Sequence, residues 1–173
     1  PRYWAQQLRD LVSAELDTDL FVNVYYRLAT DKKAIEDYLK LQPYLKPERL
    51  EELLAEIDGY KPFKVQVLAA EERYEEIKTI VKLHPGDWHY PELISPILEV
   101  YPEFCFSHIK QKALETIENQ RGRSTYQRIT EWLQMARAIP GYKEQNRLLA
   151  LTLYNHKPAL PALRDELKRG GLL

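Results

Sequence analysis

The sequence predicts an all-α protein, and three observations support this class. Apolar residues recur at helical spacing, no run of four or more residues alternates β-branched or aromatic with polar side chains, and all six glycines lie outside the expected helices. Glycine is unfavourable inside a helix and common just beyond its end. The clearest stripes have the spacing i, i+3, i+4, i+7: Phe21, Val24, Tyr25 and Leu28, and then Leu50, Leu53, Leu54 and Ile57.

Five helices are expected in the first half of the chain, at residues 2–15, 18–29, 32–42, 47–57 and 62–83. The second and fourth contain the two stripes above, and the third contains a shorter stripe from Ile35. Pro47 and Pro62 are each placed at a helix start, where a missing N–H costs nothing, and Gly59 separates these two helices. The fifth helix continues through a further stripe that starts at Tyr74.

Five more helices are expected in the second half, at residues 91–100, 103–120, 124–138, 142–155 and, as a short last one, 158–169. Ser124 and Gln127 have the spacing of a capping box, just before a long apolar stripe. That stripe consists of Tyr126, Ile129, Trp132, Leu133 and Ala136. We therefore expect Trp132 to be buried.

The joins between these helices are short, which favours antiparallel neighbours stacked in chain order. The pattern Tyr-x-x-Ile occurs at Tyr74 and Tyr126 but gives no fixed period. We expect either an irregular helical-repeat array, similar to an α-solenoid, or a compact bundle of about nine to ten helices. Residues 1–173 are expected to form one domain with a subdomain joint near 84–88, and the start at Pro1 rather than Met indicates a fragment of a longer protein.

The composition of the chain excludes several classes of protein. With 173 residues, 45% hydrophobic and 29% charged, the chain can bury a core, which excludes a disordered class. A single cysteine excludes a disulfide or a cysteine-based zinc site within the chain. Apolar runs are far shorter than the roughly 20 residues that cross a bilayer. We expect a cytoplasmic protein with no membrane partner and no cofactor.

Charge is divided unevenly along the chain. From Pro1 to Phe106 there are 13 Lys and Arg against 20 Asp and Glu, a balance of −7. From Ser107 to Leu173 there are 12 against 6, a balance of +6. This division favours head-to-tail contact or an acidic partner for the basic half, and the alternative is two solvated surfaces of opposite sign.

His84, Asp87 and His89 form the most enzyme-like cluster, because two imidazoles and a carboxylate can ligate a metal or transfer protons. Their spacing matches no metal motif, and Pro85 and Gly86 make the segment a turn. Turn hydrogen bonds and helix capping explain the same residues. We therefore expect no metal and no catalytic residue here, and a metal-dependent hydrolase is the least favoured alternative.

Cys105 and His108 are three residues apart on an expected helix and so share a face. Such a pair can act as nucleophile and base, or supply half of a zinc site. Phe104 and Phe106 flank Cys105, an apolar setting in which a free thiol packs as a small hydrophobic group. We therefore expect Cys105 to belong to the core.

Arg121, Arg123 and Arg128 form the densest basic group and are the candidate residues for binding an anion or nucleic acid. Arginines at a helix start bind phosphate through their charge and the exposed N–H groups. Tyr126 and Trp132 lie among them, but on the stripe that is expected to face the core. A solvated basic surface or a protein contact is therefore favoured over nucleic-acid binding.

Several features of the second half occur in a fixed order: Arg73-Tyr74 opening a helix, the tract from Pro91 to Pro102 before Phe104, the helix around Tyr126 to Leu133, the helix from Tyr142 to Tyr154, and an ending with Lys157-Pro158-Ala159-Leu160, Leu163, Glu166 and Leu167. Over residues 68–167 this order resembles the C-terminal helical region of bacterial SWIM zinc-finger proteins. The zinc motif of that family, Cys-x-Cys followed by Cys-x-His, is absent from this chain. The resemblance implies a helical arm beside the finger, with nucleic-acid or protein association belonging to the whole protein.

The favoured function is a non-enzymatic helical-repeat module that mediates protein–protein contact or self-association within a larger protein, in the manner of a scaffold. The helical pattern without a catalytic constellation and the charge division support it. The alternative is an accessory nucleic-acid-binding domain that uses the basic second half, with weak binding expected.

Overall fold

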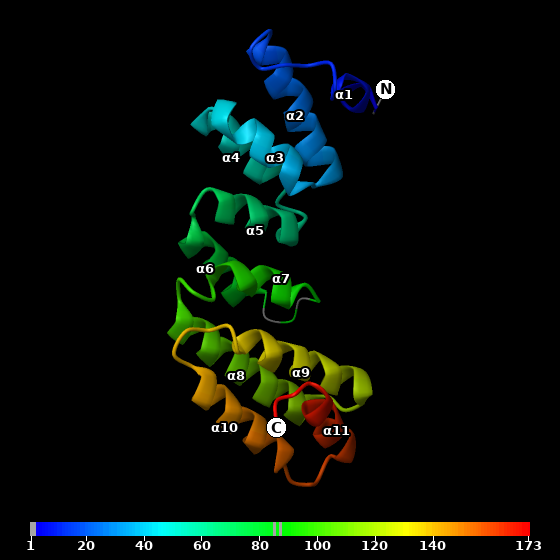
Figure 1. Cartoon of the computed structure of the whole chain (residues 1–173), viewed down its shortest axis with the longest axis vertical. Helices are drawn as coiled ribbons and strands as arrows, with labels where there is room; N and C mark the ends of the chain where they lie inside the picture. The colour runs from blue at the N-terminus through cyan, green and yellow to red at the C-terminus, as the bar shows by residue number, and fades with distance from the viewer. Residues whose placement is uncertain (1–2, 85, 87) are drawn as a thin grey trace. The chain divides into compact units, whose positions relative to one another are not determined.

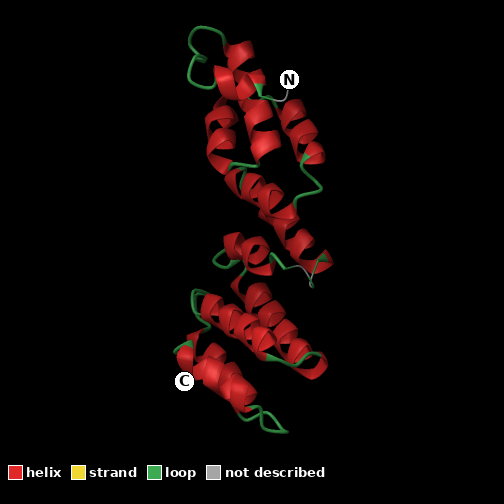
Figure 2. Ribbon diagram, turned by 90° about the vertical axis from the view of Figure 1, so that its right-hand side faces the viewer, coloured by secondary structure: helices red, strands yellow, loops and turns green. Residues whose placement is uncertain are grey.

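The computed structural model describes residues 3–84, 86 and 88–173. Within these residues the chain forms eleven α-helices, two short 3-10 helices and no strand (Figures 1 and 2). The predicted all-α class with about ten helices is therefore confirmed. The chain divides into two compact units, Pro1–Ile77 (unit 1) and Lys78–Leu173 (unit 2), with the boundary inside α6 (Tyr74–Leu83). The expected joint near 84–88 lies beyond that boundary, and its residues 85 and 87 are outside the described ranges.

Unit 1 is built around α2. Its elements before α6 are α1 (Trp4–Leu8), α2 (Thr18–Lys32), α3 (Ile35–Leu41), the 3-10 helix η1 (Gln42–Tyr44), α4 (Pro47–Glu56) and α5 (Lys61–Ala70). Helix α2 packs against α1, α3 and α4, and α3 also packs against α5. The two stripes predicted from the sequence supply buried side chains to this core, among them Val24, Leu28, Leu53 and Leu54.

The prediction of a single helix at 62–83 is wrong, because the chain forms two helices there, α5 and α6, with a break between them. Glu72 adopts a left-handed conformation, with φ of 56°. The N–H of Glu72 bonds to the carbonyl of Ala69, and the N–H of Arg73 bonds to the carbonyl of Leu68. This pair of bonds is a Schellman ending, which usually has glycine at the left-handed position. Here glutamate occupies it, so the sequence contains no visible stop.

Other expected helices are shorter than predicted, and the one at 32–42 is limited to α3. The helix at 2–15 is reduced to α1. The helix at 91–100 becomes α7 (Tyr90–Ile94) followed by the 3-10 helix η2 (Ser95–Ile97), because Pro96 has no N–H to continue an α-helical ladder. The helix at 158–169 begins at Pro161, the first residue of α11 (Pro161–Arg169), where its missing N–H is tolerated.

Unit 2 continues with α8 (Pro102–Asn119), α9 (Arg123–Ala136), α10 (Lys143–Tyr154) and α11. Helix α9 packs against α8, α10 and α11, and α10 also packs against α8 and α11. The predicted stripe on α9 faces this core, and Trp132 is only 5% exposed, which confirms its predicted burial. The buried amide of Asn146 donates to the carbonyl of Leu133 at 2.8 Å and ties α10 to α9.

The C-terminal segment closes against α9 through a glycine. A Cβ atom at Gly170 would lie 2.5 Å from the Thr130 methyl carbon, so only glycine fits without movement of α9. The Gly170 carbonyl accepts from the side chain of Gln134 at 3.1 Å. None of the helices in the described ranges has the length and apolar character needed to cross a bilayer.

The Trp132→Ala variant is expected to lose about 3–5 kcal/mol of unfolding free energy, because truncating a buried aromatic side chain removes apolar contacts and leaves a cavity. Urea unfolding of the whole chain measures this loss. The matched control is Leu148→Ala on α10, because the Leu148 side chain is 51% exposed. This variant should lose no more than about 0.5 kcal/mol of unfolding free energy. Equal losses in the two variants would contradict the packing described for α9.

Candidate binding groove

A groove of about 550 Å³ runs along α8 in unit 2. The α8 side chains that line it are His108, Gln111, Lys112, Glu115, Thr116 and Asn119. Their spacing of three and four residues places them on one face over about three turns, a length of about 16 Å at 1.5 Å per residue. The α9 side chains Arg128, Glu131 and Trp132 form a second wall, and the other lining residues lie at 82–91 and at Gln120. We call this site the α8–α9 groove.

Two aromatic rings hold a lysine that lines the groove. Tyr90 is fully buried and its ring meets Trp132 edge-on at 5.6 Å between centroids. The Lys112 ammonium lies 4.5 Å from the centre of the Tyr90 ring and 5.1 Å from that of Trp132. A cation over two aromatic faces is stabilised by the ring quadrupoles. The positive charge of Lys112 is therefore fixed at the groove.

The Tyr90 hydroxyl also pairs with Nδ1 of His108 at 2.8 Å. Burial, and after it the charge of Lys112, lower the pKa of His108 below its usual 6.5. Burial raises the pKa of Tyr90. Both side chains are therefore neutral near pH 7, and the positive charge at the groove comes from lysine and arginine.

An exposed tryptophan lies at the groove beside an arginine. Trp88 is 82% exposed, and the Arg128 guanidinium carbon lies 5.1 Å from its ring centre. Arg128 donates from Nη2 to the side-chain oxygen of Gln120 at 2.7 Å. The Nε–H of Arg128 is buried and has no acceptor among the described residues. The groove thus presents a large apolar ring next to a cation whose partner is a neutral amide.

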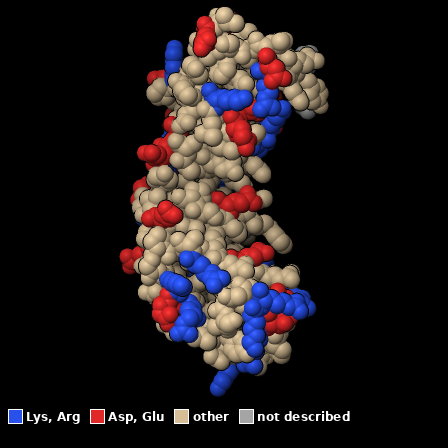
Figure 3. Space-filling view, viewed as in Figure 1, with Lys and Arg blue, Asp and Glu red and all other residues tan. Residues whose placement is uncertain are grey.

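The structure separates the three arginines singled out in the sequence. Arg123 pairs with Asp165 at 2.9 Å and with Glu166 at 2.7 Å, both on α11. The hydrogen bond to Glu166 is the main cause that raises the pKa of Arg123. Arg121 is exposed and donates to a backbone carbonyl, and only Arg128 lines the groove. Figure 3 shows basic and acidic side chains interspersed on the face that it draws.

The Cys105 thiol is fully buried, and its Sγ lies 3.4 Å from the carbonyl oxygen of Ile97, to which it donates. Burial raises the pKa of Cys105 to about 12, so the thiol stays protonated at neutral pH. A thiolate is the nucleophilic and metal-binding form of cysteine. The interpretation of Cys105 as a core residue is therefore confirmed.

The cluster of His84, Asp87 and His89 is described only in part, because Asp87 lies outside the described residues. His89 pairs through Nδ1 with Glu92 at 3.2 Å. Across residues 3–84, 86 and 88–173, no three His, Cys, Asp or Glu side chains come together as ligands for a metal ion.

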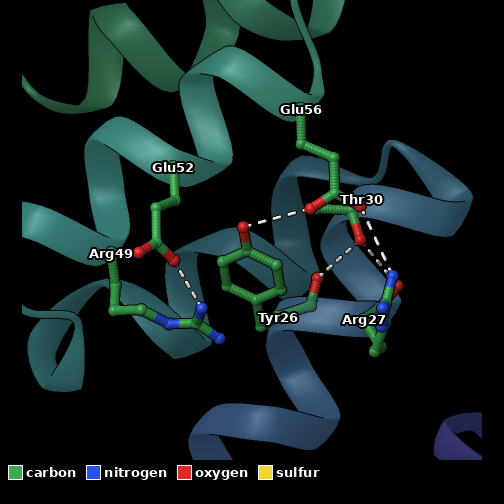
Figure 4. Close-up of polar contacts among 6 residues, drawn as sticks. All are labelled: Tyr26, Arg27, Thr30, Arg49, Glu52 and Glu56. Carbon is green, nitrogen blue, oxygen red and sulfur yellow. Dashed lines mark hydrogen bonds and ion pairs between the residues drawn. The ribbon is translucent and has the colours of Figure 1, made fainter.

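Unit 1 contains a second polar site, a cavity of about 600 Å³ lined by Trp4, Leu20, Asn23, Tyr26, Arg27, Arg49, Glu52 and Glu56. Figure 4 shows Tyr26 of α2 between the carboxylates of Glu52 and Glu56 on α4. Its hydroxyl donates to Glu56 at 3.1 Å, and the Arg49 guanidinium carbon lies 4.5 Å from the centre of its ring. Arg49 pairs with Glu52, and Arg27 pairs with Glu56. Each charge at this cavity has an opposite charge beside it, so the cluster links α2 to α4.

Sequence reasoning missed Trp88, Lys112 and the Tyr26 cluster as parts of polar sites. Trp88 lies in the joint predicted near 84–88, and Lys112 belongs to a helix face whose polar residues are typical of a solvated surface. The available signal was the run of polar residues at spacings of three and four along 108–119. Compared with known proteins, the chain matches no family model, no curated protein and no solved structure.

The unfolding free energy should depend on Tyr26 at high pH. Burial and the hydrogen bond to Glu56 raise the pKa of Tyr26 from 10.0 to about 12. A raised pKa in the folded state stabilises the fold below pH 10, and this stabilisation is lost as the pH rises from about 10 to about 12. Between these pH values the parent should lose about 1–2 kcal/mol more unfolding free energy than Tyr26→Phe.

Urea unfolding of both proteins at a series of alkaline pH values measures this difference. Tyr3→Phe is the control, because Tyr3 is 70% exposed, and it should follow the parent. Parallel curves for the parent and Tyr26→Phe would contradict the assignment.

Proposed function

We propose that this chain is a non-enzymatic helical module that binds a segment of another protein in the α8–α9 groove. The observation that carries the proposal is the exposed ring of Trp88, stacked with Arg128, at a groove that follows α8 for about three turns. Tryptophan and arginine are the residues most enriched where protein interfaces concentrate their binding energy. A ring this exposed gains much from being covered by a partner.

The polar lining favours an extended segment as the occupant. Gln111, Asn119 and Gln120 carry amide groups that both donate and accept. The backbone of an extended peptide needs hydrogen-bond partners along its whole length, whereas a helix satisfies most of its own backbone groups. A groove of about 16 Å accommodates about five extended residues at 3.3 Å each.

The state of the reactive side chains supports binding rather than catalysis. The Cys105 thiol is buried and protonated, and the His108 imidazole is occupied by Tyr90. Lys112 is held over two rings. His108 and Lys112 line the groove, and Cys105 belongs to the core beneath it, which is the arrangement that a binding module needs.

Selection from a library of short random peptides displayed on phage, with the whole chain as bait, tests the proposal. We expect enriched peptides whose affinity falls about tenfold or more in Trp88→Ala, the size of effect that loss of a central interface tryptophan produces. Leu148→Ala is the control, because it removes an exposed apolar side chain that does not line the groove. Peptides that bind both variants equally, or a failure to enrich any peptide, would refute the proposal.

Nucleic-acid binding is the second candidate, and one observation favours it: an arginine beside an exposed tryptophan can bind a phosphate and stack a base. Glu115 and Glu131 in the same groove oppose it, as does the pairing of Arg123 with two carboxylates.

We expect a Kd no tighter than about 10⁻⁵ M for single-stranded or duplex DNA at about 150 mM salt, in the range of non-specific binding. Fluorescence anisotropy with labelled strands measures it. Submicromolar binding that Arg121→Ala with Arg123→Ala weakens would make nucleic-acid binding the better candidate.

We also propose that the chain is the helical region beside a SWIM zinc finger in a longer protein. The order of helical features over residues 68–167 supports it. The sequence of the intact protein tests it directly, because a Cys-x-Cys and Cys-x-His motif outside this chain is required by the proposal.

A further inference from the structure

We infer that the segment bound in the α8–α9 groove presents a carboxylate to Arg128, next to an apolar or aromatic side chain that covers Trp88. This inference rests on the proposed function, and it adds the chemistry that the groove selects. It is carried by the state of Arg128, by the exposure of Trp88 and by the charges along the groove.

Arg128 differs from most arginines of the chain in its partner. Among the residues that the structure describes, the arginines that pair with a carboxylate are Arg9, Arg27, Arg49, Arg73, Arg123, Arg147 and Arg169. Arg128 is half-buried, and within the described ranges its side-chain partner for hydrogen bonding is the neutral amide of Gln120. A half-buried guanidinium with a neutral partner is short of the negative charge that stabilises it best.

The free position on Arg128 suits a carboxylate. Its Nε–H has no acceptor among the described atoms, and Nη2 is bonded to Gln120. Nε and Nη2 lie on the same edge of a guanidinium, so the two oxygens of one carboxylate can accept from both. Gln120 is exposed beyond the end of α8, and its side chain can rotate away as the carboxylate enters. The incoming acid thus replaces one neutral acceptor and satisfies a second donor.

Trp88 defines the neighbouring position on the ligand. Its ring is 82% exposed and adjoins the guanidinium, so a side chain next to the ligand carboxylate reaches the ring. Covering this apolar surface releases water and adds affinity. The ligand therefore combines an acidic residue with an apolar or aromatic one.

The charges along the groove favour one carboxylate over a polyanion. Lys82, Lys112 and Arg128 line the groove together with Glu115 and Glu131. A single acid is attracted by the cations, whereas the successive phosphates of a nucleic acid would also meet the two glutamates. An acidic peptide and a nucleic acid can each supply an anion to Arg128. The charges along the groove favour the acidic peptide.

Peptides enriched in the selection described above test this inference. Each is synthesised with its Asp or Glu and, separately, with Asn or Gln in that position, and both forms are titrated against the whole chain by fluorescence anisotropy. We expect the amide form to bind about tenfold more weakly, the discrimination that loss of a charge-assisted bidentate pair produces. Arg128→Gln should bring the two affinities together, because the acid then loses the guanidinium that binds both of its oxygens.

Two variants make the result specific. Arg147→Gln on α10 is the matched control, because Arg147 is exposed and paired with Glu144, and it should leave the ratio of acid to amide affinity unchanged. Arg128→Lys retains the charge but loses the planar pair of donors, so the ratio of acid to amide affinity should be reduced but not abolished. This variant replaces Arg128→Gln if circular dichroism shows that Arg128→Gln does not fold.

Each outcome separates the inference from the proposed function. Peptides that depend on Trp88 but bind equally as acid and amide would overturn the inference and leave the function standing. If folded Arg128→Gln keeps the parent's ratio of acid to amide affinity, the inference is also overturned and the function stands. A single-stranded oligonucleotide that displaces the peptide at lower concentration would show that phosphate is the preferred anion and overturn the inference. Peptide binding that does not depend on Trp88 would refute the function itself.

Discussion

The packing of α8 into the core of unit 2 is the constraint on which the groove depends. Cys105, Ile109, Ala113 and Ile117 recur every four residues along α8 and are all buried. A helix that buries this stripe against α9 and α10 must turn its flanking polar face outward. The groove side chains lie on that flank, so their positions follow from the apolar stripe. Because α8 runs for 18 residues, the polar face is long enough to receive a segment of polypeptide.

The aromatic cluster joins the core to the groove. Trp132 belongs to the buried stripe of α9, and its ring also lines the groove and carries part of the contact with Lys112. Tyr90 connects the same ring to His108 of α8. Tyr90 and Trp132 pack edge-to-face, which leaves each ring few alternative positions. The charge of Lys112 is therefore held at a fixed point before any ligand arrives. Preorganisation of this kind lowers the entropy that binding would otherwise cost.

Helical periodicity predicted the buried stripes well, because apolar spacing is a local property of the sequence. It failed between α5 and α6, where the helix ends at a left-handed glutamate, Glu72, and the stop depends on two backbone hydrogen bonds rather than on glycine. The arginines show a second limit. Arg123 looks like an anion-binding residue in the sequence, but its partners lie 42 and 43 residues away on α11. Such pairing is set by the fold, so charge density along the chain could not reveal it.

The α8–α9 groove and the Tyr26 cluster use the same stacking of arginine on an aromatic ring and differ in how the charge is balanced. In unit 1, Arg49 covers Tyr26 and pairs with Glu52, and the Tyr26 hydroxyl is bonded to Glu56. Charge, ring and hydroxyl are all satisfied there, so an incoming group would have to displace existing partners. In unit 2, Arg128 stacks on Trp88 with only a neutral amide as its side-chain partner among the described residues, and the ring itself is exposed. Since affinity comes from interactions that the free protein lacks, the balance of charge distinguishes a structural link from a binding site.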